Sequence, residues 1–418
     1  MMGNHQNSTD VTIIGAGIVG MSCALQLQQQ GLSVTVVDQE APGDSTSHGN
    51  AGVIARCGCI PVAMPGFAWQ VPSLLLDPAG PLSMPLSNAL NIAPWGLKFI
   101  RNSSKNRILK ISSSLNALLQ DALPLHLEQA KLAQAQHLVK SSPYHYLYRD
   151  LAAFEKEKLA WQLRREYGVK YDPIDVSELR NLEPDVSTEF NFAVSLQDHG
   201  FTSNPGGLVK AIAKHFQKAG GIILQRKIMG FVKNDDTVHA LQSDQGDILV
   251  KKLVIAGGAW SAKLAKELQD NVPLTSERGY HIEVASPNVE LNSPIMFSEG
   301  KLVATPMEGG IRFAGLVELQ KPDAEADTKF GRRLLHHAKQ LFPAIDTSDF
   351  VEWMGSRPSI TDSLPVIGKS VKYEKVFYAF GHQHMGLTLA PKTGKLITDL
   401  ILDKPSSIDL SPYRVNRF

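Results

Sequence analysis

The 418-residue sequence predicts a mixed α/β (α+β) fold in which a parallel βαβ domain is interleaved with a domain built on an antiparallel sheet. Three observations predict this arrangement. The first 38 residues alternate strand, turn, helix and strand; residues 273–318 are mostly short strands; and the chain ends on another strand, loop and helix. Because one hydrophobic core does not keep growing at this length, we expect two closely joined domains.

The opening unit reads as a βαβ motif. Residues 11–14 form a short apolar run, residues 15–20 are rich in glycine, and residues 21–30 have helical apolar spacing. A second β run at 33–37 closes on Asp38. This order of elements predicts two parallel strands joined by a helix.

Residues 57–94 carry seven prolines interleaved with apolar side chains. At this density proline disfavours long helices and central strands, so we expect an ordered excursion over the surface or the active site. A packed connector, a lid and a membrane-facing loop are the alternatives. Helical spacing resumes at 95–139 and again at 155–167. The prolines are Pro61, Pro65, Pro72, Pro78, Pro81, Pro85 and Pro94.

The second half of the chain alternates between helices, buried strands and turns. Its expected elements are a helix at 207–218, strands at 222–224 and 253–256, a β-meander at 228–250, the antiparallel strands of 273–318, and a final strand, loop and helix at 376–380, 381–386 and 387–402.

The pattern Gly15-x-Gly17-x-x-Gly20 follows a strand and opens a helix, and Asp38 lies 18 residues after its last glycine. Gly15 suits a sharp turn, Gly17 lets a pyrophosphate approach the backbone, and Gly20 permits close helix packing. Asp38 can accept hydrogen bonds from the ribose of an adenosine. A glycine pattern alone would also fit a purely structural turn. The complete unit instead favours a Rossmann-like dinucleotide site.

The segment that follows decides between NAD and FAD. A nicotinamide enzyme would normally continue with further parallel βα units, whereas this chain continues with small, hydroxylated and glycine residues at 44–52. Such a segment offers backbone donors and hydroxyl groups to a second phosphate and to a flavin ring lying along extended chain. FAD is therefore favoured.

Six motifs in this order resemble the D-amino-acid oxidase superfamily, and the resemblance runs nearly from end to end. Within the superfamily the chain most resembles bacterial FAD-dependent D-amino-acid dehydrogenases, including D-hydroxyproline dehydrogenases, with glycine oxidase further off. The motifs are the Gly15 fingerprint, Thr46-Ser47-x-x-Asn50-Ala51-Gly52, Gly257-Gly258-x-Trp260, Gly279-Tyr280, Arg357-Pro358-x-x-x-Asp362-x-x-Pro365-x-Ile367-Gly368, and Gly381-His382-x-x-x-Gly386-Leu387-Thr388.

The resemblance implies a discontinuous Rossmann-like FAD-binding domain at 9–60, 185–272 and 352–418, and a substrate-binding domain at 61–184 and 273–351. We expect the FAD to be non-covalent, because related flavoproteins with histidyl flavin space their histidine differently from His48. The helix after Gly386 would direct its N-terminal donors at the flavin. The expected cofactor-binding residues are Gly15, Ala16, Gly17, Ile18, Val19, Gly20, Asp38, Gln39, Thr46, Ser47, Asn50, Ala51, Gly52, Val53, Ile228, Gly257, Trp260, Gly381, Gly386, Leu387 and Thr388.

Three residues are candidates for the substrate site. Arg357 matches the family arginine that pairs with the substrate carboxylate, a role suited to a planar guanidinium; a structural arginine is the alternative. His384 occupies a loop position where glycine oxidase carries a second arginine, so it either touches substrate or packs the loop. The Tyr280 hydroxyl is a candidate partner for the carboxylate.

The resemblance implies hydride transfer from the α-carbon of a small D-amino acid to flavin N5, with D-proline and D-hydroxyproline among the candidates. The electrons would pass to a quinone or another carrier, and the proline-rich segment could reach a membrane. The alternatives are a glycine- or sarcosine-type amine oxidase that uses oxygen, and a flavoprotein that modifies the side chains of a partner protein.

Composition limits the partners and the compartment. The formal net charge of +1 and the lack of a basic run give no reason to expect nucleic acid. Cys57 and Cys59 form a C-x-C pair without the second ligand pair of a zinc site, and three cysteines cannot build a disulfide framework, so we expect no metal and a reducing compartment. The polar leader shows no signal peptide, which predicts a cytoplasmic protein, with a peripheral contact on the inner membrane face left open.

Overall fold

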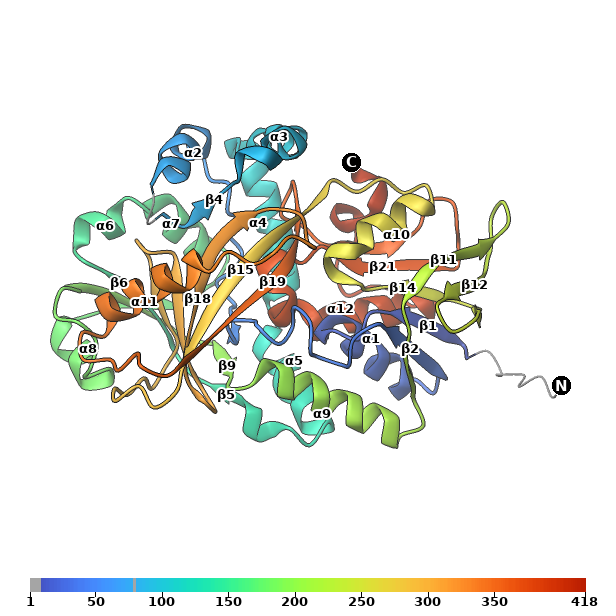
Figure 1. Cartoon of the computed structure of the whole chain (residues 1–418), viewed down its shortest axis with the longest axis horizontal. Helices are drawn as coiled ribbons and strands as arrows, with labels where there is room; N and C mark the ends of the chain where they lie inside the picture. The colour runs from blue at the N-terminus through green and yellow to red at the C-terminus, as the bar shows by residue number, and fades with distance from the viewer. Residues whose placement is uncertain (1–8, 78–79) are drawn as a thin grey trace.

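Two large sheets lie next to each other in the computed structural model, which describes residues 9–77 and 80–418 (Figure 1). The chain crosses between the sheets repeatedly, so each sheet combines segments that are far apart in sequence. The polar leader at 1–8 and Pro78 of the proline-rich segment lie outside the described residues. The mixed α/β architecture expected from the sequence is confirmed.

The first sheet has six strands in the order β10-β2-β1-β14-β21-β20. Its strands are parallel except β20, which runs antiparallel to β21 at the edge. Val11 pairs with Val34 across β1 and β2, so the expected βαβ unit is present. The strand bounds are β1 Val11–Ile14, β2 Val34–Asp38, β10 Ile222–Gln225, β14 Leu253–Ile255, β20 Val366–Lys369 and β21 Val376–Phe380.

Alternation along these strands places apolar side chains on both faces. Ile13 and Val36 pack with helices α1, α9 and α12, whereas Ile14 and Val37 pack with a β-meander and helix α10. A sheet covered on both faces in this way is typical of parallel strands. The covering elements are α1 Ile18–Gln29, α9 Pro205–Lys218, α12 Gly386–Ile401, α10 Ser261–Glu267, β11 Ile228–Lys233, β12 Val238–Ser243 and β13 Ile248–Leu249.

The second sheet is mostly antiparallel and follows the order β19-β15-β18-β17-β16-β6-β8-β7, with β4 paired to β18. Helix α11 (Lys329–Leu341) covers one face, where Phe330 and Leu334 join a buried apolar cluster. The other face turns toward the first sheet and lines the cavity described below. The strand bounds are β4 Leu82–Ser83, β6 Tyr144–Tyr148, β7 Tyr171–Ile174, β8 Phe192–Leu196, β15 Leu274–Val284, β16 Ile295–Phe297, β17 Leu302–Met307, β18 Gly310–Leu319 and β19 Phe350–Ile360.

The remaining elements surround the two sheets. In the described ranges no helix is both long and apolar enough to cross a bilayer. These elements are helices α2 Phe67–Leu76, α3 Leu86–Arg101, α4 Lys105–Leu119, α5 Ala122–Leu132, α6 Leu151–Glu155, α7 Lys158–Glu166 and α8 Val176–Leu182, short helices η1 Gln136–Leu138, η2 Gly258–Trp260, η3 Gln383–Met385, η4 Ser411–Tyr413 and η5 Val415–Arg417, and a small sheet of β3 Val53–Ile54, β9 Gly200–Thr202 and β5 Val139–Ser141.

The expectation that prolines exclude long helices from 57–94 is wrong. Helices α2 and α3 contain Pro72 and Pro94 in their interiors. A proline removes one backbone hydrogen bond, but tertiary contacts hold α3 in place. Asn88 and Trp95 donate to the backbone oxygens of Leu319 and Ser359 at 3.1 and 3.2 Å. These bonds to β18 and β19 offset the loss, and the segment packs against the second sheet.

Two strands belong to a different sheet from the one that the expected domain boundaries suggest. β8 lies within the segment 185–272 and β19 overlaps the segment 352–418, yet both pair in the nine-stranded sheet. The domain division itself stays a prediction. Strand pairing places the crossings between the two sheets at about 200 and about 361, just after β8 and β19.

Helix α12 contains a proline that its surroundings compensate. Pro391 has no N–H group, so the carbonyl oxygen of Leu387, four residues earlier, lacks its usual helical donor. The ring of His126, from α5, lies 2.9 Å from this oxygen through Nε2 and supplies the missing hydrogen bond. Burial lowers the pKa of His126 to about 4, so the ring is neutral at pH 7 and Nε2 carries the proton that it donates.

Replacing His126 by phenylalanine should therefore lower the stability of the protein by about 1–3 kcal/mol, because a buried carbonyl loses its donor while the ring volume is kept. Thermal unfolding of the variant, compared with His137→Phe at an exposed position, measures this effect. Equal unfolding midpoints for His126→Phe and His137→Phe would show that the His126 hydrogen bond does not stabilise α12.

Candidate functional site

A cavity of about 580 Å³ lies between the two large sheets and is lined from both. This volume is within the range of small-molecule sites. Most residues that the sequence singled out border it. They are Gly15, Gly17, Ile18, Val19, Asp38, Gln39, Thr46, Ser47, Asn50, Ala51, Val53, Ile228, Gly257, Trp260, Tyr280, Arg357, Gly381, His384, Gly386, Leu387 and Thr388.

The glycine fingerprint forms one end of the cavity. Gly15 has φ +112°, and a β-carbon there would lie 2.4 Å from the backbone oxygen of Ala256. A β-carbon on Gly20 would lie 1.9 Å from the backbone oxygen of Gly15. Neither position therefore accepts a larger residue. The close packing leaves the N-terminus of α1 open to a phosphate.

Asp38 ends β2 beside this turn. Its Oδ2 accepts a hydrogen bond from the backbone N–H of Ala16 at 2.7 Å, and its Oδ1 accepts one from Glu40 at 3.0 Å. Each oxygen keeps a free lone pair for a ribose hydroxyl. Ala16 itself does not border the cavity and acts through this hydrogen bond, which fixes the carboxylate.

The loop at 44–52 connects the fingerprint with the second sheet. Ser47 Oγ accepts a hydrogen bond from the backbone N–H of Ile18 at 3.0 Å, which ties the loop to the start of α1. Asn50 Oδ1 accepts one from the backbone N–H of Gly52 at 2.9 Å. His48 is not among the described residues that line the cavity, and its ring lies 6.1 Å from that of Trp353.

Arg312 on β18 clamps the same loop from the side of the second sheet. Its Nη1 donates to the backbone oxygens of His48 and Asn50 at 2.9 and 2.7 Å. Its Nε and Nη2 donate to Glu283 at 3.0 and 2.7 Å. Arg312 is 5% exposed, so a buried charge pair holds the loop. Arg312 is not among the residues predicted from the sequence, because no local pattern marks it.

The N-terminus of α12 borders the cavity between the loop and β19. Thr388 Oγ1 accepts a hydrogen bond from the backbone N–H of Ala55 at 3.2 Å and donates one to the backbone oxygen of Val53 at 3.3 Å. These bonds hold α12 against β3. The helix dipole therefore points its positive end into the cavity.

The residues present fit FAD. Two glycines whose β-carbons would collide with the backbone form the turn under a phosphate, Asp38 stands at the ribose position, and the cavity continues past the 44–52 loop to the start of α12. Each of these features corresponds to one part of the dinucleotide. When bound, FAD would supply the hydride acceptor.

Arg357 enters the cavity from β19. Its Nη1 donates to Glu277 Oε1 at 3.2 Å, and Ser359 Oγ donates to the other oxygen of Glu277 at 2.7 Å. A β-carbon on Gly279 would lie 2.3 Å from the guanidinium carbon, so Gly279 makes the room in which this side chain lies. Arg357 is 21% exposed, which leaves donors for an anionic ligand.

The Tyr280 hydroxyl is not beside Arg357. It donates to Glu318 Oε2 at 2.7 Å and accepts from the backbone N–H of Asp327 at 3.2 Å, while its ring stacks on Phe330 of α11. In β15 successive side chains point to opposite faces. Because Glu277, the neighbour of Arg357, is three residues before Tyr280, the two side chains point to opposite faces. The Tyr280 hydroxyl therefore does not lie where it was expected to contact a carboxylate bound to Arg357.

His384 lies in η3, and its side chain is exposed to the cavity. The protein around the cavity lowers the pKa of His384, chiefly because it displaces water that would solvate the imidazolium; Glu277 opposes this effect and Arg357 adds to it. His384 therefore lies near Arg357, and its contact with a substrate stays a prediction.

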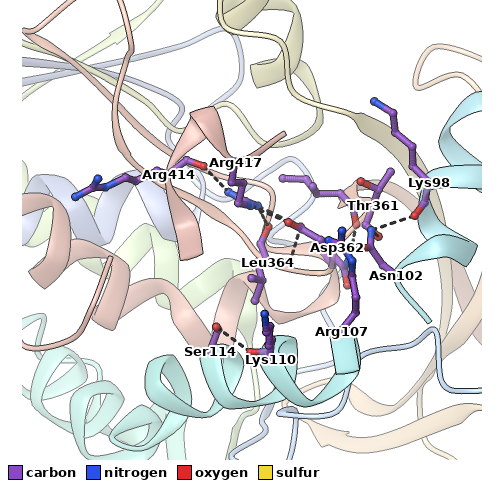
Figure 2. Close-up of polar contacts among 12 residues, drawn as sticks. Lys98, Asn102, Arg107, Lys110, Ser114, Thr361, Asp362, Leu364, Arg414 and Arg417 are labelled. Carbon is purple, nitrogen blue, oxygen red and sulfur yellow. Dashed lines mark hydrogen bonds and ion pairs between the residues drawn. The ribbon is translucent and has the colours of Figure 1, made fainter. Parts of the chain in front are cut away.

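The segment after Arg357 is anchored at several points (Figure 2). Asp362 accepts hydrogen bonds from Arg417 Nε and Nη2 at 2.8 and 3.2 Å, and Arg417 Nη2 also donates to the backbone oxygen of Leu364 at 2.7 Å. Asn102, after α3, donates to the backbone oxygen of Thr361 at 2.9 Å. The chain therefore leaves β19 in a fixed direction, which steadies the strand that carries Arg357.

The wall of the cavity formed by β6, β16 and β17 contains none of the residues predicted from the sequence. Tyr144 and Tyr146 of β6 border it, together with Met296 and Val303, and Arg164 of α7 lies beside them. The tyrosines recur at every second residue of the run Tyr144-His145-Tyr146-Leu147-Tyr148, a pattern typical of a strand with one aromatic face. That pattern was available in the sequence, whereas the position of Arg164 was not.

Replacing Arg312 by alanine should weaken FAD binding at least tenfold, because the 44–52 loop loses two charge-assisted hydrogen bonds and Glu283 loses its partner. Titration of the apoprotein with FAD, followed by flavin fluorescence, measures the dissociation constant. Arg332→Ala, at an exposed position, serves as the control. An unchanged affinity in Arg312→Ala would mean that the clamp does not support the cofactor.

Comparison with known proteins agrees with this geometry. The family model described as "FAD dependent oxidoreductase" (DAO) matches residues 10–400. The chain is 34% identical over 415 residues to a D-amino-acid oxidase of Bradyrhizobium diazoefficiens, covering 98% of both chains. It is 28% identical over 428 residues to a D-amino acid dehydrogenase of Paramagnetospirillum magneticum, again covering 98% of both.

The fold has solved counterparts. The structure of glycine oxidase from Geobacillus kaustophilus superposes with a TM-score of 0.76 at 19% identity, covering 98% of this chain and 99% of that one. The glycine fingerprint, the cavity between the sheets and the family match over nearly the whole length all indicate the same family. This chain belongs to the DAO family of FAD-dependent oxidoreductases.

Proposed function

We propose that this chain oxidises a small D-amino acid at its α-carbon and passes the electrons to a quinone or another carrier. The observation that carries the proposal is the position of Arg357, whose guanidinium enters the cavity close to the start of α12. An arginine here can bind a carboxylate through two parallel N–H groups. The D-amino-acid oxidase and dehydrogenase among its relatives support the same substrate class.

Glu277 limits what Arg357 binds. Since one N–H of Arg357 already donates to Glu277, the carboxylate of the substrate would take the remaining donors. Glu277 also balances the guanidinium charge while the site is empty of substrate. This arrangement favours a substrate with a single carboxylate at this end of the cavity.

We further propose that His384 contacts the substrate. Its lowered pKa keeps the imidazole neutral near pH 7, so it is a hydrogen-bonding group and not a second cation beside Arg357. A neutral ring suits a substrate whose amine must be uncharged for the hydride to leave. The cavity supplies orientation and excludes water, and the chemistry requires no protein nucleophile.

One surface of the protein supports a membrane quinone as the electron acceptor. Trp69, Leu90 and Leu97, on α2 and α3, are 89%, 89% and 70% exposed. The stretch 78–120 carries five basic residues and no acidic one, which suits an anionic bilayer. Figure 1 shows α2 and α3 next to each other at one side of the second sheet.

The second candidate is an amine oxidase that passes its electrons to oxygen, with glycine or sarcosine as substrate. The 34% identity to a protein named as an oxidase favours the oxygen reaction, and the likeness in fold to glycine oxidase gives the substrate to test. Both candidates use the same cofactor site and the same Arg357. They differ in the reaction that follows substrate oxidation.

Anaerobic mixing of the FAD-loaded protein with D-amino acids, L-amino acids, glycine, sarcosine and both prolines tests the substrate class. We expect D-amino acids to bleach the flavin absorbance, with slow recovery in air and fast recovery on adding a quinone analogue. Fast recovery in air with release of peroxide would replace the dehydrogenase by the oxidase. If no amino acid bleaches the flavin, a partner protein's side chain becomes the better substrate.

Replacing Arg357 by alanine should raise KM at least tenfold, because loss of a charge-assisted pair costs at least about 1.4 kcal/mol. Steady-state kinetics with the best substrate of the panel measure this change. Arg414→Ala, at an exposed position, is the control. An increase in KM of less than about threefold would remove Arg357 from the carboxylate site.

A further inference from the structure

A second arginine borders the cavity at the end away from Arg357. Arg164 comes from α7 and is 8% exposed. Its guanidinium lies over the rings of Trp161 and Tyr146, at 4.4 and 5.3 Å from their centroids, and its Nε donates to the backbone oxygen of Cys57 at 3.4 Å. These contacts fix the planar group in one orientation.

Arg164 has no carboxylate in an ion pair with it in the described part of the chain. Its Nη1 is buried without a hydrogen-bond partner among those residues. Glu157, whose charge acts on Arg164, already pairs with Lys301 at 2.7 Å and accepts from the Tyr148 hydroxyl at 2.9 Å. Placing a charge inside a protein without a partner is unfavourable, and an anionic ligand would offset this cost.

Arg164 and Arg357 stand over the same face of the second sheet. Tyr146, Met296, Val303 and Ala314 pair in sequence across β6, β16, β17 and β18, and all four border the cavity. Their row leads from the strand beneath Arg164 toward β15, where the Arg357 guanidinium lies over Gly279. The cavity therefore carries one cation at each end of this floor.

The strand spacing sets the scale of a ligand that reaches both cations. Four intervals separate β15 from β6, about 19 Å at about 4.8 Å each. A ligand that bridges the two arginines needs two carboxylates separated by several bonds.

We infer that Arg164 binds a second carboxylate of the substrate, which makes the substrate an acidic amino acid with an extended side chain. The inference rests on the proposed function, in which Arg357 binds the α-carboxylate. It narrows the substrate from small D-amino acids in general to dicarboxylic ones.

The thiol of Cys57 is the competing counter-ion for Arg164. Burial raises the pKa of Cys57, but the neighbouring His199, Arg164 and Tyr146 lower it to about 7. A thiolate at this position would neutralise Arg164 without any ligand. In that case the cavity would show no preference for a dicarboxylate.

Binding of two acids that cannot be oxidised tests the inference without turnover. Calorimetric titration of the FAD-loaded protein with glutarate and with butyrate compares a dicarboxylate with a monocarboxylate of similar length. We expect glutarate to bind at least tenfold more tightly. Equal affinities would overturn the inference, whether Arg164 is paired with the Cys57 thiolate or serves only to pack α7.

The matched variants are Arg164→Met and Arg165→Met, on the same helix. Arg165 is exposed and lies over the Tyr171 ring at 4.9 Å, outside the cavity. In Arg164→Met we expect the ratio of kcat/KM for D-2-aminoadipate to that for D-alanine to fall at least tenfold, with Arg165→Met unchanged. An equal loss for both substrates would make Arg164 a structural residue. If Arg164→Met does not fold, the wild-type comparison of glutarate with butyrate decides.

These outcomes separate the inference from the proposed function. If D-alanine bleaches the flavin but glutarate binds no more tightly than butyrate, only the second carboxylate site is contradicted. If glutarate binds tenfold more tightly than butyrate but no amino acid bleaches the flavin, the proposed reaction is contradicted and the anion site is retained.

Discussion

The in-register pairing of β15 with β19 is the constraint on which the site depends. The two strands pair without a shift from Leu274 with Ile360 to Val284 with Phe350. Since side chains alternate between the faces of a sheet, this register places Glu277 beside Arg357, which borders the cavity, and turns the Tyr280 side chain toward α11. A slip by one residue would exchange the two faces and remove the arginine from the site.

Cofactor and substrate sites form at the contact between the two sheets. The loop at 44–52 begins next to the fingerprint of the first sheet, but Arg312 and Glu283 of the second sheet hold it in place. The FAD site is therefore complete only when both sheets have formed and packed. This dependence gives Arg312 a role in cofactor binding although it lies far from the fingerprint in sequence.

The arginines of the second sheet differ from Arg164 in having a carboxylate partner. Arg278 pairs with Glu318, Arg312 with Glu283 and Arg357 with Glu277, each across neighbouring positions of the strands. Such pairs offset the cost of placing a charge inside the protein. Arg164 has aromatic rings and a carbonyl oxygen around it but no carboxylate partner in the described residues, and this difference points to a ligand.

The sequence alone determined the βαβ unit, the glycine turn and Asp38, because each depends on residues within a few positions of one another. It failed at Pro72 and Pro94, where contacts with the second sheet outweigh a lost backbone bond. The tertiary structure alone decided the face of Tyr280, the clamp of Arg312 on a loop 264 residues away, and the position of Arg164 against Cys57, 107 residues away. Contacts over such separations leave no local pattern, because they depend on how strands and helices pack.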